Sequence, residues 1–192
     1  LSPTSIVIAS SLSGSSRFTN MIVYDRSKDA SPASAEFFVR RSFSQSAMPI
    51  NYEKLITREI PAVEQRLTKR DTMLYALGVG LGADPCDVNQ LKFAYEENLQ
   101  ALPTMAIILG YPGPWHAHPD TGITRSHVVH GEQSFSYHRA ACVGDTVTVR
   151  STLSDIYDKK NGALEFVVKT SRATNQQGEL VAELRTVIVC RH

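Results

Sequence analysis

Polar and apolar positions alternate along the last third of the chain, and the alternation divides into four segments. Apart from Gln133, apolar or small side chains occupy every second position in residues 129–137, 146–153, 164–168 and 180–188. A period of two, with many β-branched and aromatic residues, is typical of strands that bury one face. The sequence therefore predicts four strands that form an antiparallel meander, and the apolar face of such a sheet needs a cover.

Turn residues occupy the joins between these strands. Lys160-Asn161-Gly162 separates the second strand from the third, and Asn-Gly is favoured in hairpins because both central residues of a type I′ turn need positive φ. Gly144-Asp145 precedes the second strand, and Asn-Gln-Gln-Gly at 175–178 separates the last two. These short joins predict strands that follow one another closely.

Helical signals begin upstream of the strands. Thr68 stands three residues before Asp71, which is a helix-capping pattern, and leucines then recur at helical spacing at positions 74, 77 and 81. The glycines of 78–82 cannot sustain a helix, so we expect this run to end the helix rather than bind phosphate. Residues 88–97 fit either an irregular loop or a short helix.

A second apolar helix is predicted over Leu102–Leu109, with Pro103 in its first turn, where the missing N–H costs nothing. The proline-rich residues 111–124 that follow predict a loop. An antiparallel sheet wrapped around this central apolar helix is a two-layer α+β arrangement. The predicted architecture is the hot-dog fold.

The composition excludes several classes of protein. The net charge is +1 and no basic run occurs, so nothing favours a nucleic-acid partner. The longest apolar run, Met105–Leu109, is too short to span a bilayer. The three cysteines, Cys86, Cys142 and Cys190, are odd in number and widely spaced, which favours reduced intracellular thiols over a disulfide framework or a zinc site.

The first 47 residues differ from the remainder. They are rich in serine and arginine and poor in acidic residues, which is typical of an organelle transit peptide and also fits an extension without a targeting role. We therefore divide the chain into a leader or extension, residues 1–47, and a globular domain, residues 48–192.

Three places in the sequence could carry chemistry. His116, His118 and Asp120 lie together in the predicted loop, but catalytic zinc sites usually take ligands from separated elements, so no metal site is predicted. Trp115 beside them either contacts a ligand or packs the loop down.

His130-Gly131 opens the first strand, where the glycine allows a backbone or a ligand to come close. His130 is either a hydrogen-bond donor to a bound carbonyl or a structural residue.

Four segments in register resemble the N-terminal half of the MaoC-like (R)-specific enoyl-CoA hydratases, the hydratase 2 unit of peroxisomal multifunctional β-oxidation enzymes. They are Tyr75–Gly80, Leu91–Glu96, Leu102–Thr104 and His130–Gln133. The resemblance extends over residues 50–191. It implies two hot-dog units side by side, of which the C-terminal one carries the catalytic Asp and His in a D-x-N-P-x-H motif. That motif does not occur in this sequence.

The resemblance therefore implies that this chain is the non-catalytic, acyl-binding half of an enzyme that hydrates trans-2-enoyl-CoA to (R)-3-hydroxyacyl-CoA in fatty acid β-oxidation. The Asp/His pair is expected in a second hot-dog unit of the same or another chain. Glu96 is the one catalytic candidate here, and it either acts as a base, if its pKa is raised, or holds the loop. The substrate is an acyl-CoA thioester, and no cofactor is implied. The residues expected to bind it are Leu74, Leu102, Pro103, Met105, His130, Gly131 and Tyr137.

The same resemblance implies a homo-oligomer and a peroxisomal location, or a mitochondrial one if residues 1–47 are a transit peptide. Two alternatives remain open. In the first alternative, the chain is a non-enzymatic acyl-CoA-binding or pairing subunit. In the second, it is an acyl-CoA thioesterase. A thioesterase needs an acidic residue on the central helix, and residues 103–110 contain none.

Overall fold

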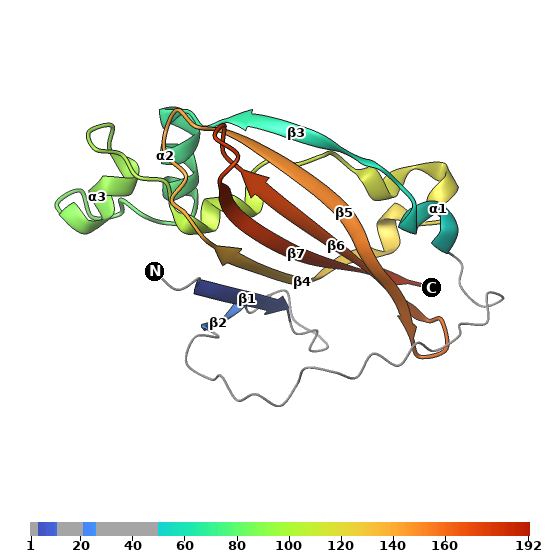
Figure 1. Cartoon of the computed structure of the whole chain (residues 1–192). Coiled ribbons are helices and arrows are strands. Elements are labelled where there is room, and N and C mark those ends of the chain that lie inside the picture. Colours follow the sequence, from blue (N-terminus) through green and yellow to red (C-terminus); the bar gives the residue numbers. More distant parts are fainter. Residues whose placement is uncertain (1–3, 11–20, 26–49) are drawn as a thin grey trace, which may run out of the picture.

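The computed structural model describes residues 4–10, 21–25 and 50–192. These residues form an antiparallel sheet with the strand order β2-β1-β4-β7-β6-β5-β3. The long strands of this sheet run diagonally through Figure 1. The strands are β1 (Thr4–Ser10), β2 (Met21–Asp25), β3 (Ile60–Arg66), β4 (Val128–Tyr137), β5 (Thr146–Lys159), β6 (Leu164–Thr174) and β7 (Leu180–Arg191). Within the region expected to be a leader, only β1 and β2 are described, and β1 pairs with β4; the transit-peptide prediction otherwise lies outside the described residues.

The helical elements are short. They are α1 (Tyr52–Ile56), α2 (Lys69–Gly78), α3 (Val88–Ala94) and the 3-10 helices η2 (Pro103–Ile108), η3 (Trp115–Ala117), η4 (Pro119–Thr121) and η5 (Arg125–His127). Figure 1 shows α2 and α3 beyond one end of the sheet and α1 at the other. The α+β hot-dog prediction is confirmed: an antiparallel sheet with few helices covers most of the described chain.

The four predicted strands are all present, but their order in the sheet differs from a simple meander. Strands β5, β6 and β7 follow one another as hairpins, whereas β4 pairs with β7 and not with β5. The meander prediction was wrong for β4, because alternation along a strand shows which side chains are buried and does not show which neighbour the strand pairs with. The sequence analysis also missed β3, a short edge strand that contains Pro61.

Local capping and turn predictions are confirmed. The Thr68 side chain accepts a hydrogen bond from the Asp71 N–H at 3.1 Å, and α2 ends at Gly78. Lys160 and Asn161 both have positive φ, at 57° and 54°, as the hairpin between β5 and β6 requires. The ambiguous segment 88–97 begins with helix α3, which the Asp87 side chain caps.

The central element is shorter than a full helix. The predicted helix over 102–109 is the six-residue 3-10 helix η2, with Pro103 at its first position. At about 2.0 Å per residue it is about 12 Å long, whereas the fourteen residues of β5 extend for about 46 Å at about 3.3 Å each. Consequently η2 covers only part of one sheet face, the one that carries Phe135, Val149 and Leu184 and that we call the inner face.

Two apolar clusters pack on the inner face. The first joins η2 to the sheet, and its buried residues include Met105, Ala106, Leu109, Phe135, Val149 and Leu184. The second joins α1 and the loop before β4 to the other end of the sheet, and its buried residues include Leu55, Ile60, Leu153, Ile156, Val167 and Ile188. The stretch of inner face between the two clusters is therefore the place where a cavity can form.

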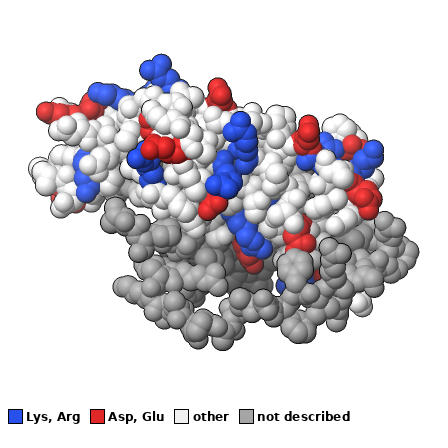
Figure 2. Space-filling model, viewed as in Figure 1, with Lys and Arg blue, Asp and Glu red and all other residues white. Residues whose placement is uncertain are grey.

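The surface carries charges of both signs. Figure 2 shows lysine and arginine interspersed with acidic residues on the visible face, in keeping with the net charge of +1. Within the described part of the chain, no helix has the length and apolar character that crossing a membrane would need.

Candidate functional site

A cavity of about 220 Å³ lies between η2 with its following residues and the inner face of the sheet. Its walls are Ile107, Ile108, Leu109, Gly110, Tyr111 and Pro112 on one side and Val149, Ser151, Lys169, Ser171, Leu184 and Thr186 on the other. Whole-ligand pockets in proteins are commonly about 300–1,000 Å³. A space of this size accommodates one segment of a long ligand, such as part of an acyl chain.

A row of polar side chains crosses β5, β6, β7 and β4 on the inner face, and four of its members, Ser151, Ser171, Lys169 and Thr186, line the cavity. We call this row, Ser151, Ser171, Lys169, Thr186 and Gln133, the polar belt. Ser151 faces Ser171 in the sheet, and Thr186 faces both Lys169 and Gln133, so the five side chains share one face. Apolar residues of the two clusters lie on either side of the belt.

Hydrogen bonds hold most of the polar belt in place. The two serine hydroxyl oxygens are 2.8 Å apart, and the Thr186 hydroxyl donates to Gln133 Oε1 at 2.9 Å. One hydrogen bond between two hydroxyls uses only one of their two hydrogens. The serine pair therefore keeps a second O–H for a group inside the cavity.

Lys169 is the charged member of the belt and, among the described residues, the one charged residue that lines the cavity. Burial lowers the pKa of its ammonium group, because partial removal from water disfavours the charged form. No ion pair of Lys169 with a carboxylate occurs within the described residues. The cavity thus combines apolar walls with one cation that a buried salt bridge does not neutralise.

Gly110 forms the tightest point of the cavity wall. Its φ is +59°, and a Cβ at this position would lie 2.5 Å from Cβ and Cγ2 of Val149. Its N–H donates to Gln65 Oε1 on β3 at 2.9 Å. Only glycine lets the chain after η2 approach β5 this closely, so the position of the wall depends on this residue.

His130 and Gly131 lie at a bulge in β4. Burial, with the positive charge of Lys169 adding to it, lowers the pKa of His130, so this predicted site residue is electrostatically linked to the cavity. A Cβ on Gly131 would lie 2.8 Å from Val189 Cγ2 and 3.2 Å from the Val187 carbonyl oxygen. The close approach that the glycine allows is therefore to the neighbouring strand β7.

Four other predicted site residues lie around η2 without lining the cavity. Leu102 and Pro103 begin the helix, and Met105 is buried in the first cluster. Tyr137 packs against that cluster, and its hydroxyl oxygen accepts a hydrogen bond from the Ala141 N–H at 3.2 Å. Burial raises the pKa of the Tyr137 phenol. These residues support the element that covers the cavity.

Leu74 and Glu96 lie outside the cavity. Leu74 is on the exposed side of α2, with 58% of its surface accessible, and Glu96 is exposed in the loop after α3. The Lys69 ammonium donates to the backbone oxygen of Glu96 at 3.2 Å. The structure does not bring either residue together with His130 or the polar belt.

The histidine-rich loop before β4 packs on the second cluster through Trp115. Asp120 receives hydrogen bonds from Arg58 and from the His118 ring, the latter at 2.6 Å. Among the described residues, no group of three or more His, Cys, Asp or Glu side chains is arranged to hold a metal ion. The polar residues of this loop thus connect it to the rest of the domain.

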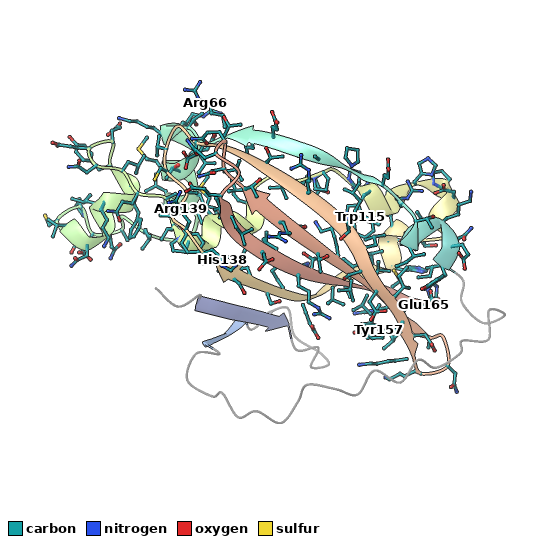
Figure 3. All side chains as sticks on the ribbon, viewed as in Figure 1. Arg66, Trp115, His138, Arg139, Tyr157 and Glu165 are labelled. Carbon is teal, nitrogen blue, oxygen red and sulfur yellow. The ribbon has the colours of Figure 1, made fainter. Side chains whose placement is uncertain are left out.

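An acid and an imidazole do meet at one end of the sheet. Nε2 of His192 lies 2.5 Å from a carboxylate oxygen of the fully buried Glu165. Figure 3 places Glu165 near Tyr157 and Trp115, at the opposite end from His138 and Arg139. Burial raises the pKa of Glu165, and His192 opposes this shift. Neither residue lines the cavity, so the pair is not positioned to act on a ligand there.

The sequence analysis missed the polar belt, although a signal was present. Val147, Val149 and Leu153 mark the buried phase of β5, and Ser151 occupies that same phase. Lys169 and Ser171 likewise fall in the buried phase of β6, between Val167 and Ala173. Polar residues in phase with an apolar face indicate a buried network or a ligand site.

Comparison with known proteins gives a family match. Residues 54–184 match the model of the "FAS1-like, dehydratase domain region". This range begins in α1 and extends into β7, so it includes every residue of the polar belt except Thr186.

Individual relatives agree with this match. The chain is 32% identical over 125 residues to a probable enoyl-CoA hydratase 2 of Dictyostelium discoideum, covering 61% of this chain and 40% of the relative. It is 34% identical over 148 residues to a UPF0336 protein of Parafrankia sp. (strain EAN1pec), covering 75% and 96%. A MaoC-like dehydratase structure from Phytophthora capsici superposes with a TM-score of 0.57 and 25% identity, covering 74% and 49%.

The chain therefore spans about half or less of the length of two of these proteins and nearly the whole length of the third.

Proposed function

Because this chain belongs to the FAS1-like dehydratase family, whose members share the hot-dog fold with MaoC-like hydratases and dehydratases, we propose that it is an acyl-binding unit. The enzyme it serves adds water to a trans-2-enoyl-CoA thioester and produces (R)-3-hydroxyacyl-CoA. The observation that carries this proposal is the cavity between η2 and the inner face of the sheet. A role in fatty acid β-oxidation is part of the proposal.

The cavity suits an alkyl chain because most of its wall is aliphatic. Ile107, Leu109, Val149 and Leu184 line it, and the open side is bordered by the half-exposed Ile108. Each methylene buried there contributes about 0.8 kcal/mol. The affinity for acyl-CoA should therefore rise about fourfold per added carbon until the cavity is filled.

Water addition needs a general base and a general acid near the double bond. No carboxylate or imidazole of the described part of the chain lines this cavity, and the Glu165–His192 pair lies elsewhere. We propose that a second hot-dog unit, in the same or another chain, supplies the Asp/His pair. The larger size of the hydratase and dehydratase relatives supports this arrangement. The present chain then fixes the acyl tail and so orients the thioester for the partner's residues.

A pair of matched variants tests the acyl-binding role. Ile108→Glu places a charge at the mouth of the cavity, and Leu77→Glu places the same charge on α2 at a residue that is exposed to nearly the same extent, 52% against 50%. We expect Ile108→Glu to weaken binding of a long-chain acyl-CoA at least tenfold and Leu77→Glu to leave it unchanged. Fluorescence of the single tryptophan, Trp115, or calorimetry gives the dissociation constant. Equal affinities in both variants would contradict the assignment of the cavity.

An activity assay tests the division of labour. The chain alone should not hydrate an enoyl-CoA, whereas a mixture with a MaoC-like unit that carries D-x-N-P-x-H should do so. In the mixture, Ile108→Glu should lower kcat/KM for long enoyl chains and spare crotonyl-CoA, whose short tail does not reach the cavity. Full activity of the chain alone would refute the assignment of the Asp/His pair to another unit. Release of free CoA thiol would instead indicate a thioesterase.

The alternative of a non-enzymatic subunit predicts a different outcome. In that case the chain associates with a second hot-dog unit, or with a copy of itself, and binds acyl-CoA without contributing to turnover. Size-exclusion chromatography of the chain with and without the catalytic unit, combined with the assay above, separates the two possibilities.

We also propose that the protein functions in an organelle, the peroxisome by its family resemblance or the mitochondrion if residues 1–47 direct import. Fusing residues 1–47 to a fluorescent protein and imaging the cell tests the mitochondrial version. A diffuse signal would count against it.

A further inference from the structure

Lys169 is a cation that no carboxylate of the described residues pairs with, and its position in the cavity affects which ligands fit. Lys169 projects from the centre of the inner face, with Ser171 on its own strand and Thr186 opposite it in β7. A plain alkyl chain in this cavity would remove water from the ammonium group and offer it no partner, which is unfavourable. An acyl chain that carries a negative charge at this depth would restore the lost interaction.

We propose, on the basis of the function proposed above, that Lys169 and the serine pair make this unit selective for acyl thioesters whose chain carries a carboxylate, that is, the monothioesters of dicarboxylic acids. The Lys169 ammonium pairs with the carboxylate, and a hydroxyl of Ser151 or Ser171 donates to its second oxygen. The aliphatic wall residues bury the methylenes between the carboxylate and the thioester.

The charge count favours a carboxylate over a phosphate. Of the lining residues that the structure describes, Lys169 alone is charged, and a single lysine matches a single negative charge. Phosphate groups are generally held by several donors, such as arginine side chains or free backbone N–H groups. The N–H of Gly110, which also lines the cavity, is already bonded to Gln65 Oε1 at 2.9 Å. The remaining neutral donors are hydroxyls, which suit one carboxylate.

The polar groups around Lys169 are fixed by hydrogen bonds to one another. Thr186, opposite it, is held by its hydrogen bond to Gln133 at 2.9 Å, and the serine hydroxyls are held by each other at 2.8 Å. His130 lies near enough for the lysine charge to affect its ionisation. The belt is therefore a preformed polar surface. Its lysine carries a positive charge that no carboxylate of the described residues neutralises.

The test compares two thioesters of equal carbon number, decanoyl-CoA and the mono-CoA thioester of decanedioic acid, with shorter and longer pairs to scan the depth of the cavity. For the unmodified chain we expect the dicarboxylic thioester of the best-fitting length to bind about tenfold more tightly than its methyl-ended counterpart, a difference of about 1.4 kcal/mol. Lys169→Met should abolish this preference and tighten binding of decanoyl-CoA. Lys169→Arg should retain the preference.

Matched controls distinguish a local effect from general charge or folding effects. Lys54→Met removes an equivalent positive charge from the exposed surface of α1 and should leave the preference unchanged. If Lys169→Met does not fold, Lys169→Gln keeps a polar group of similar length and should also abolish the preference. Thermal unfolding of each variant verifies the fold.

The outcomes separate this inference from the proposed function. Binding of decanoyl-CoA with no preference for any dicarboxylic thioester refutes the selectivity and leaves the acyl-binding role intact. A preference that survives both Lys169→Met and Lys169→Gln refutes the assignment to Lys169. Failure of every thioester to bind refutes both proposals.

Discussion

Replacing Gly110 by alanine tests how closely the chain after η2 packs on the sheet. The added Cβ would lie 2.5 Å from Cβ and Cγ2 of Val149, well inside van der Waals contact, and the residue has φ +59°. An alanine in the left-handed region costs about 1–2 kcal/mol, and overpacking of a tight contact costs about 1–3 kcal/mol. We therefore expect the free energy of unfolding to fall by about 2–5 kcal/mol.

Gly113 supplies the matched control for this substitution. It has a similar φ, +78°, but a Cβ there would meet no atom within 4 Å. Gly113→Ala should therefore cost only the backbone term of about 1–2 kcal/mol. The stabilising loss of unfolded-state entropy that accompanies any glycine-to-alanine change is common to both variants and cancels in the comparison.

Urea unfolding followed by circular dichroism measures both variants. With a slope of about 2 kcal/mol per M, the midpoint for Gly110→Ala should fall by about 1–2.5 M, clearly more than for Gly113→Ala. Because Gly110 also lines the cavity, Gly110→Ala should weaken acyl-CoA binding as well. Equal midpoints for the two variants would show that the chain at Gly110 does not contact Val149, and the described wall of the cavity would then be wrong.

Three further predictions concern parts of the fold outside the cavity. Thr68→Ala removes the side-chain cap of α2 and should destabilise the domain by about 1 kcal/mol in urea unfolding; an unchanged midpoint would show that the cap does not contribute. A thiol reagent at neutral pH should modify the exposed Cys86 and Cys142 quickly and Cys190 only after denaturation, because Cys190 is buried and its pKa is raised to about 11; three fast thiols in the native protein would contradict the burial. Burial raises the pKa of Glu165 in the folded state. The stability that its protonated form contributes is therefore fully present below the ordinary glutamate pKa of about 4.3, and it is lost as the pH rises through the folded-state pKa. Glu165→Gln should therefore flatten the dependence of the unfolding midpoint on pH in that window, and a variant with the same pH profile as the unmodified chain would refute the assignment.

The elements of this fold that depend on neighbouring residues could be read from the sequence. Alternation identified the inner-face residues of β4, β5 and β7, but in β6 the inner face carries Val167 and Ala173 and not the expected phase of residues 164, 166 and 168. Thr68, Lys160 and Asn161 act through bonds and backbone angles within a few residues. Pro103 begins η2 as its position in the apolar run indicated. The family resemblance, which rested on four short segments in order, agrees with the match over residues 54–184.

The tertiary structure decided what these elements form together. The sequence by itself determined the strands, the buried faces of all of them except β6, and the positions of the caps and turns, because these follow from propensity and local geometry. It did not determine that β4 pairs with β7, that the central element is a short 3-10 helix, or that Ser151, Lys169 and Thr186 meet beneath it. Those features depend on contacts between residues far apart in the chain, and such contacts are selected by the packing of the whole domain.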